Sequence, residues 1–153
     1  MPWNPTLNDD LAGTFTDDHR GIDAVWAEIE AAVDEGSEGP DALRERVRSF
    51  VAHMNRHLAM EEEVLFPAFE RATGMVNGPT QVMRMEHEQM RSVLVQIEEH
   101  AKRGDFGGAL DHGDTLHMLI QQHNMKEEGM LYRMAAAHLS WPDLKGQLES
   151  YVG

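Results

Sequence analysis

The chain has 153 residues and no cysteine, and its 27 acidic against 13 basic side chains give a formal charge of −14. The length favours a single domain over 1–153 with one sizeable core, and the lack of cysteine excludes disulfides, thiolate metal sites and cysteine nucleophiles. The negative charge argues against nucleic-acid and membrane partners because it repels phosphates and anionic lipids, and the polar N-terminus and the absence of a bilayer-length apolar run predict a cytoplasmic protein.

The predicted elements are almost all helices. An extended arm over 1–13 is expected first, and then a helix over 16–35 with Thr14 or Thr16 as its N-cap and Gly36 just past its end. Helical periodicity then predicts, in chain order, helices over 41–73 (kinked at Pro67), 80–103, 106 or 109 to 138, and a short C-terminal helix over 141–152. Short loops join the long helices. The predicted fold is therefore all-α, an up-down-up-down antiparallel four-helix bundle with a short C-terminal helix.

Each long helix carries one apolar stripe at three- and four-residue spacing. Every stripe is interrupted at one or two positions, and the interruptions are always His or Glu. In chain order they are His19, His57, Glu61, His87, His123 and Glu127. After Glu127 the last stripe is predicted to continue through Met130 and Met134. Burying a carboxylate or an imidazole costs several kcal/mol unless it is paired or bound to metal, so these six positions need a physical reason.

The sequence repeats itself at this point. HLAMEE at 57–62 and HNMKEE at 123–128 share a His-x-x-x-Glu-Glu pattern at an offset of 66, and His19 corresponds to His87 at an offset of 68. With 9 His and 16 Glu, about one His-x-x-x-Glu pair is expected by chance, and two occur, both on apolar faces. An imidazole and a carboxylate one helical turn apart can reach the same ion.

The two halves together supply four imidazoles and two carboxylates. Such a set suits a pair of first-row metal ions bridged by the carboxylates, as in di-iron bundles. Imidazole and carboxylate donors favour iron, and zinc, manganese and copper also accept them.

His19, the HLAMEE segment, the Glu86–His87 pair and HNMKEE together resemble the hemerythrin family, in its HHE cation-binding branch. The resemblance extends over most of the chain and implies an up-down four-helix bundle with a non-haem di-iron centre. It implies that the four histidines at the matched positions are terminal ligands and that Glu61 and Glu127 are bridges. The implied cofactor is two iron ions joined by an oxo or hydroxo bridge, with zinc or manganese as substitutes.

The sequence departs from the oxygen-carrying hemerythrins, which have a fifth histidine one turn from the lone histidine of the third helix and an aspartate bridge on the fourth. Here Met83 and Arg91 occupy the positions one turn before and after His87, and the bridge is Glu127. The ligand set instead resembles a branch that contains iron-centre repair proteins, a ubiquitin ligase's iron-sensing domain and proteins that decompose peroxide. The repair proteins carry an additional cysteine-containing domain. This sequence has no cysteine, so a repair role is disfavoured.

These features predict a di-iron protein that binds or reduces a small ligand, namely O2, NO or hydrogen peroxide, with an electron donor where it acts as an oxidoreductase. Storage, delivery or sensing of metal without turnover fits the same ligands. A bundle that binds no metal is the third hypothesis.

Several residues near the six predicted ligands have expected places of their own. His53 is expected at the boundary of the core, with a role as a seventh ligand or as a partner of a ligand as the alternative. Asp23, one turn after His19, is a candidate for orienting that imidazole. Glu62, Glu86 and Glu128 are expected to be surface charges, and Glu62 and Glu128, each next to a predicted bridge, are also candidates for a further role. Four apolar side chains are candidates for the walls of a dry pocket over the metals, namely Trp26, Met60, Met90 and Met130.

Overall fold

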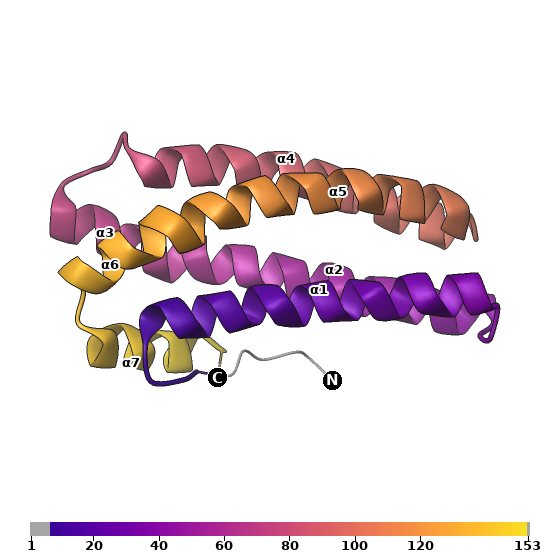
Figure 1. The fold of residues 1–153 in the computed structure, drawn as a ribbon, viewed down its shortest axis with the longest axis horizontal. Coiled ribbons are helices and arrows are strands. Elements are labelled where there is room, and N and C mark those ends of the chain that lie inside the picture. The colour runs from indigo at the N-terminus through magenta and orange to yellow at the C-terminus, as the bar shows by residue number, and fades with distance from the viewer. Residues whose placement is uncertain (1–6, 153) are drawn as a thin grey trace.

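Four long helical rods lie alongside one another, with a short helix packed at one end (Figure 1). The structure is a computed structural model that describes residues 7–152, and no strand occurs in that part of the chain. The elements are α1 (Leu11–Glu35); α2 (Pro40–Met60), η1 (Glu61–Leu65) and α3 (Phe66–Thr73); α4 (Pro79–Lys102); α5 (Phe106–Lys126), η2 (Glu127–Leu131) and α6 (Tyr132–His138); and α7 (Trp141–Val152). The predicted all-α class and the helical bundle are confirmed. Within the described part, no helix has the length and apolar character needed to span a bilayer.

The first helix begins earlier than predicted. Asp10 is its N-cap and accepts a hydrogen bond from the backbone N–H of Gly13, so neither of the two predicted threonines has this role. The prediction of an extended arm over 1–13 is therefore wrong from Leu11 onward, because capping by Asp10 satisfies the first free N–H groups of the helix. Residues 1–6 of that predicted arm lie outside the described residues.

Two of the four rods contain one π-helical turn each, where a continuous α-helix was predicted. The turns span Glu61–Leu65 and Glu127–Leu131, so each begins at one of the predicted bridging glutamates. Pro67 follows the first turn and lies at the start of α3, where a missing backbone N–H is tolerated. A π-turn contains an extra residue and joins residue i to i+5, so every side chain after it is rotated around the helix axis.

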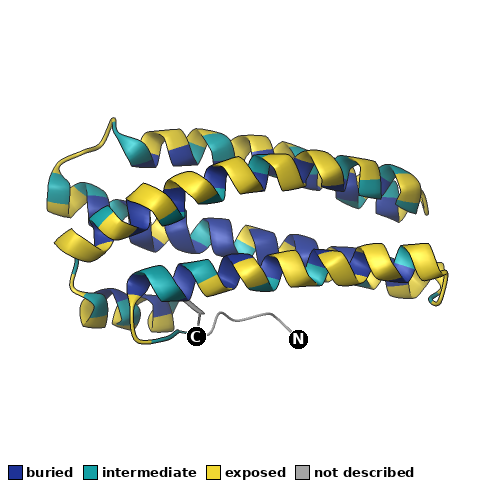
Figure 2. Ribbon diagram, viewed as in Figure 1, coloured by how far each residue is buried: buried dark blue, intermediate teal, exposed yellow. Residues whose placement is uncertain are grey.

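The inward faces of the rods are buried along their length (Figure 2). Two apolar clusters make up the core. One lies around Trp26, Phe50 and Ile97, and the other lies around Phe15 and Phe69 at the end where α7 packs. Along every rod the predicted His and Glu positions fall between members of the first cluster and members of the second. The structure therefore has a buried polar band across the bundle with apolar packing on both sides.

The apolar stripe of the fourth rod differs from the prediction after Glu127. Met130 is 48% exposed, whereas Leu131 is 1% exposed and Tyr132 is fully buried. The expectation that Met130 points inward is wrong: in η2 only Leu131 takes a core position after Glu127, whereas in η1 both Val64 and Leu65 are buried.

This register yields a stability prediction for two adjacent residues. Leu131→Ala removes a buried side chain and leaves a cavity, so we expect it to lower the free energy of unfolding by about 2–5 kcal/mol. Met130→Ala changes an exposed side chain and should stay within about 0.5 kcal/mol of the unmodified protein. Urea denaturation of the two variants measures both values. A larger loss for Met130→Ala than for Leu131→Ala would contradict the register.

Candidate metal centre

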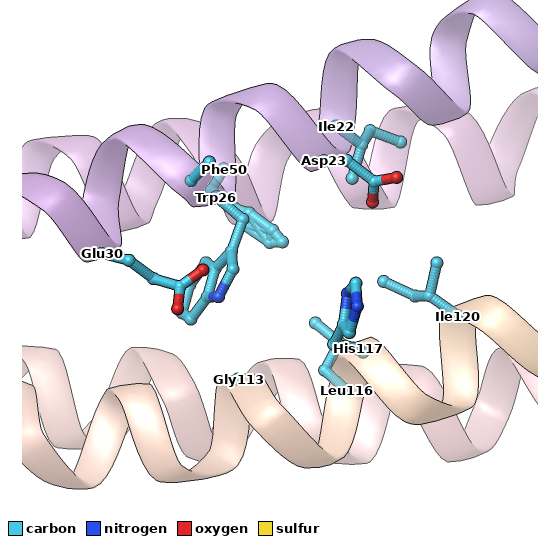
Figure 3. Close-up of a pocket in the computed structure, with 10 residues that line it drawn as sticks. Ile22, Asp23, Trp26, Glu30, Phe50, Gly113, Leu116, His117 and Ile120 are labelled. Atoms are coloured by element: carbon cyan, nitrogen blue, oxygen red, sulfur yellow. The ribbon is translucent and has the colours of Figure 1, made fainter.

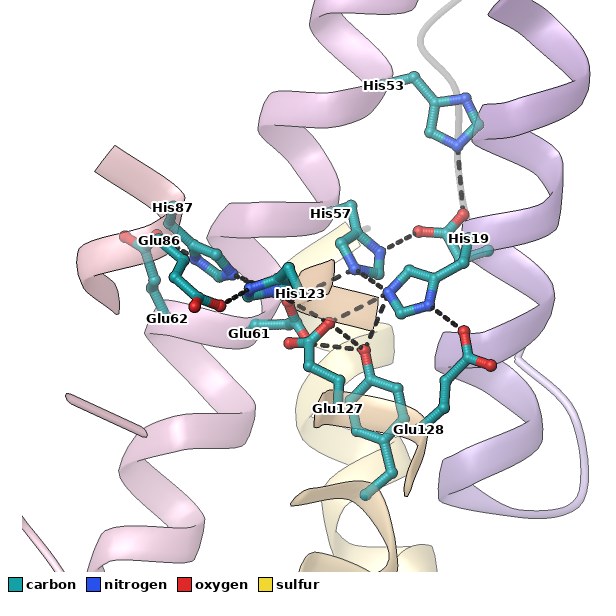
Figure 4. Close-up of polar contacts among 12 residues, drawn as sticks. His19, His53, His57, Glu61, Glu62, Glu86, His87, His123, Glu127 and Glu128 are labelled. Carbon is teal, nitrogen blue, oxygen red and sulfur yellow. Dashed lines mark hydrogen bonds and ion pairs between the residues drawn. The ribbon is translucent and has the colours of Figure 1, made fainter. Parts of the chain in front are cut away.

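The six predicted ligands come from all four rods and meet in the polar band (Figure 4). Each is almost completely buried, with at most 4% of the residue exposed. They are His19 on α1, His57 on α2, Glu61 in η1, His87 on α4, His123 on α5 and Glu127 in η2.

The four histidines form two pairs. The Nε2 atoms of His19 and His57 lie 3.1 Å apart, and those of His87 and His123 lie 3.2 Å apart. Metal–imidazole bonds are about 2.0–2.1 Å long, so two ligand atoms on one ion are typically about 3 Å from each other. Each pair therefore has a spacing that suits one metal ion.

The two glutamates connect the pairs. Glu61 Oε1 lies 3.4 Å from His57 Nε2 and 3.3 Å from His87 Nε2. Glu127 Oε1 lies 3.2 Å from His19 Nε2 and 3.1 Å from His123 Nε2. Each carboxylate thus contacts one imidazole of each pair, which is the placement that a bridging carboxylate needs.

Another layer of carboxylates surrounds the imidazoles. In each of these four histidines Nδ1 donates to one carboxylate oxygen, so Nε2 points to the centre and can bind an ion once its own proton leaves. The four contacts are His57 to Asp18 at 2.5 Å, His19 to Glu128 at 2.7 Å, His87 to Glu62 at 2.6 Å and His123 to Glu86 at 2.9 Å. The layer orients the rings before any ion binds.

This outer layer corrects several sequence predictions. Glu62, Glu86 and Glu128 are not simple surface charges, because each accepts a hydrogen bond from a predicted ligand. Asp23 is exposed, and Glu128 orients His19 in its place, since its helix reaches the Nδ1 side of the ring.

Two buried residues close to His57 in space, His53 and Asp18, differ from what the sequence predicted or were not predicted. His53 is 3% exposed rather than at the boundary, and its Nε2 lies 3.2 Å from Asp18 Oδ1, on the outer side of the centre. Sequence reasoning missed Asp18 altogether. The repeat contained a signal for it, because Asp18 directly precedes His19 just as Glu86 directly precedes His87.

Tyr132 was also missed. It is fully buried, and its hydroxyl oxygen lies 2.7 Å from Glu61 Oε2, 2.9 Å from Glu127 Oε1 and 3.1 Å from His19 Nε2. In a continuous α-helix a residue five positions after Glu127 points away from it, and the π-turn brings the two together. Burial, Glu127 and Glu61 raise the pKa of Tyr132 well above its usual value, so without a metal the hydroxyl stays protonated and donates to a glutamate.

The pKa values of three groups in the centre favour positive charge on the imidazoles and negative charge on Glu61. Burial lowers the pKa of His87, but its contacts with Glu61 and Glu62 outweigh this and raise the pKa to about 9. Burial acts in the same way on His57, and Glu61 and Asp18 raise its pKa well above the usual value. Burial raises the pKa of Glu61, but His57 and other partners hold it well below its usual range. Glu61 therefore remains charged, and the protons on His57 and His87 balance its charge.

The residues present fit a bound cation. Glu61 Oε1 and Glu127 Oε2 are buried without a hydrogen-bond partner, an arrangement that is costly unless something else compensates the charge. The donors that could share an ion form two overlapping groups, Glu61 with His87, His123 and Glu127, and His19 with His57 and Glu127. A metal ion would compensate both oxygens and replace the imidazole protons.

The raised pKa of His87 predicts how the metal-free protein responds to pH. A folded-state pKa of about 9 against an unfolded value of 6.5 means that this stabilisation is complete below pH 6.5 and is lost as pH rises through about 9. We expect the free energy of unfolding to fall over this window by on the order of 3 kcal/mol, and to fall less in His87→Gln. Urea denaturation with a chelator present measures it. A value that stays level or rises across the window would contradict the assignment.

A family comparison agrees with this geometry. The family model "Hemerythrin HHE cation binding domain" matches residues 10–135, a range that contains the six predicted ligands, their four outer carboxylates and Tyr132. No curated protein and no solved structure matches the chain significantly. The family match covers well over half of the chain, and the buried His/Glu cluster is the kind of site that the family name describes. The chain therefore belongs to the hemerythrin HHE cation-binding domain family.

Proposed function

We propose that this protein holds two iron ions in a carboxylate-bridged centre and binds or reduces a small ligand there, namely O2, NO or hydrogen peroxide. In this proposal the rods run up-down-up-down and antiparallel, which turns the two half-sites toward each other. The terminal ligands are His19, His57, His87 and His123, and the bridges are Glu61 and Glu127. The observation that carries the proposal is that each glutamate contacts one imidazole from each pair.

The donor chemistry supports iron. With no cysteine in the chain, the donors are imidazole and carboxylate, a combination typical of non-haem iron sites with open positions. Six protein donors shared by two ions leave positions unfilled, and open positions distinguish reactive metal sites from structural ones. Bound iron would supply the redox chemistry, and the chain's own residues would set its surroundings.

The space beside the centre supports a small ligand. A void of about 10 Å³ lies against His19, His57 and His123, and Met54 and Met90 are among its apolar walls. A cavity needs about 10–15 Å³ to hold a single water molecule, so this void admits only a very small molecule without rearrangement. Met90 thus lines the space as the sequence suggested, whereas Met130, on the exposed side of its helix, does not.

A larger cavity supports a route from solvent. It has a volume of about 150 Å³ and lies between α1 and α5, with side chains from both helices pointing into it (Figure 3). Ile22 and Ile120 line both this cavity and the small void, so their side chains separate the two spaces. Trp26 forms one wall and packs on Gly113, where a Cβ atom would lie 1.9 Å from the indole ring. A small apolar molecule would reach the centre when these isoleucines move.

Metal storage, delivery or sensing is the second function that the ligand set allows. Release of an ion would require the bundle to open, because each of the six predicted ligands is at most 4% exposed. The burial therefore favours a retained centre over one that exchanges metal readily, and the experiment below separates the two functions.

The proposal is tested on protein loaded with iron. We expect about two iron ions per chain, oxo-to-iron absorption bands, and spectral changes on adding NO, O2 or peroxide. Glu127→Ala should lose the dinuclear centre because a bridge serves both ions, whereas His53→Ala, which alters a buried histidine outside the ligand groups, should keep it. Metal analysis and absorption spectra measure both.

The outcomes are distinct. Two irons without any response to the three ligands, combined with rapid loss to a chelator, would support storage or delivery instead. Zinc or manganese bound in preference to iron would refute the redox proposal. Loss of one ion in His53→Ala would show that the ligand set is incomplete.

The outer carboxylates yield a further prediction about metal affinity. Glu128→Gln removes the charged acceptor that holds His19 Nδ1 at 2.7 Å, so we expect metal affinity to fall by about 10–100-fold. Asp23→Asn is the matched control, since Asp23 lies on the same side of the centre but is exposed. Competition with a chelator of known affinity measures the change. Equal losses in the two variants would contradict the role assigned to Glu128.

A further inference from the structure

The polar contacts of the centre repeat almost perfectly between its two halves. The residue before each lone histidine, Asp18 or Glu86, holds the motif histidine of the same half. The residue after each predicted bridge, Glu62 or Glu128, holds the lone histidine of the opposite half. The π-turns follow the same offset of 66, spanning 61–65 and 127–131.

One pair of positions breaks this repeat. Phe66 and Tyr132 are each the first residue after a π-turn, and both are fully buried. The Phe66 ring lies 5.5 Å from the His87 ring at 29°, and the Tyr132 ring lies 5.7 Å from the His19 ring at 30°. The two aromatic rings are thus placed equivalently, and at this position the halves differ by a single hydroxyl group.

That hydroxyl lies among atoms predicted to bind metal. Its distances of 2.7 Å to Glu61, 2.9 Å to Glu127 and 3.1 Å to His19 are those expected between neighbouring donors on one ion. The phenol has one proton and can donate to only one of the two glutamates at a time, so hydrogen bonding alone leaves its contact with the other glutamate unsatisfied. In the other half Phe66 places no donor atom beside His87.

We propose that Tyr132 is a seventh protein donor of the centre, bound to the ion held by His19 and His57. Phe66 then leaves the ion held by His87 and His123 as the one with the open position. The inference rests on the proposed function in one respect, that iron occupies the site. When the phenol oxygen binds a ferric ion, its proton is released to solvent, as for other metal ligands that bind in deprotonated form.

The test uses ferric iron alone and has a clear internal control. The chain has two tyrosines, and the other, Tyr151, is partly buried at the surface, where its hydroxyl donates to Glu63. We expect the iron-loaded protein to show visible absorption and resonance Raman bands of iron-bound tyrosinate. Tyr151→Phe should keep these bands, and Tyr132→Phe should lose them while retaining two irons.

The reciprocal variant tests the open position. Phe66→Tyr places a second phenol at the equivalent point, so we expect stronger tyrosinate bands. We also expect the affinity for azide, a small anion that binds ferric iron at an open position, to fall by roughly tenfold or more. Tyr132→Phe should still bind azide.

Three outcomes would contradict different parts of this proposal. Two bound irons without tyrosinate bands, or bands that persist in Tyr132→Phe, would overturn the assignment of Tyr132 and leave the di-iron centre intact. New tyrosinate bands in Phe66→Tyr with unchanged azide affinity would overturn the assigned open position. A protein that binds no iron would refute the proposed function and this inference together.

Discussion

The contacts between carboxylates and imidazoles at the middle of the bundle are the interaction on which the rest of the structure depends. Six carboxylates surround four imidazole rings between two apolar clusters. Three of the six, Asp18, Glu61 and Glu127, are buried, and buried charge of one sign is costly unless it is balanced, so they require positive charge among them. In the metal-free protein protons provide it, and the pKa of His87 near 9 is one result. In the proposed function iron ions provide the positive charge. Whether protons or iron ions provide it, the helices must hold the six carboxylates and the four imidazoles in register.

The two π-turns help to place the carboxylates and imidazoles in register, and they also contribute to the apolar core. Each begins at a predicted bridging glutamate and ends just before an aromatic residue that covers an imidazole. Leu65 and Leu131, the last residues of the two turns, also belong to the apolar cluster next to α7. One local distortion, unfavourable in an isolated helix, is therefore stabilised jointly by the polar band and by the packing beside it.

A centre built from two repeated halves begins with two equivalent metal positions, and equivalence gives a small ligand no preferred ion. The outer carboxylates preserve that equivalence, since each half has the same pair of contacts. Two features remove it. The hydroxyl of Tyr132 lies on the side of His19, and of the His87–His123 pair only His123 lines the small void. Asymmetry in the proposed chemistry would then come from the aromatic position after each π-turn and from the shape of the apolar wall.

The sequence by itself determined the all-helical class, most helix boundaries and the six inward His and Glu positions. These are local patterns, because a stripe at three- and four-residue spacing and its polar interruptions can be read within one helix. Only the tertiary structure decided which carboxylate faces which ring, as with His19 and Glu128, which are 109 residues apart. It also decided the π-turns, and hence the place of Tyr132, and it decided that Met130 is exposed beside the buried Leu131. An inserted residue is favourable only when the side chains beyond it gain contacts from other helices, and the sequence of a single helix does not contain those contacts.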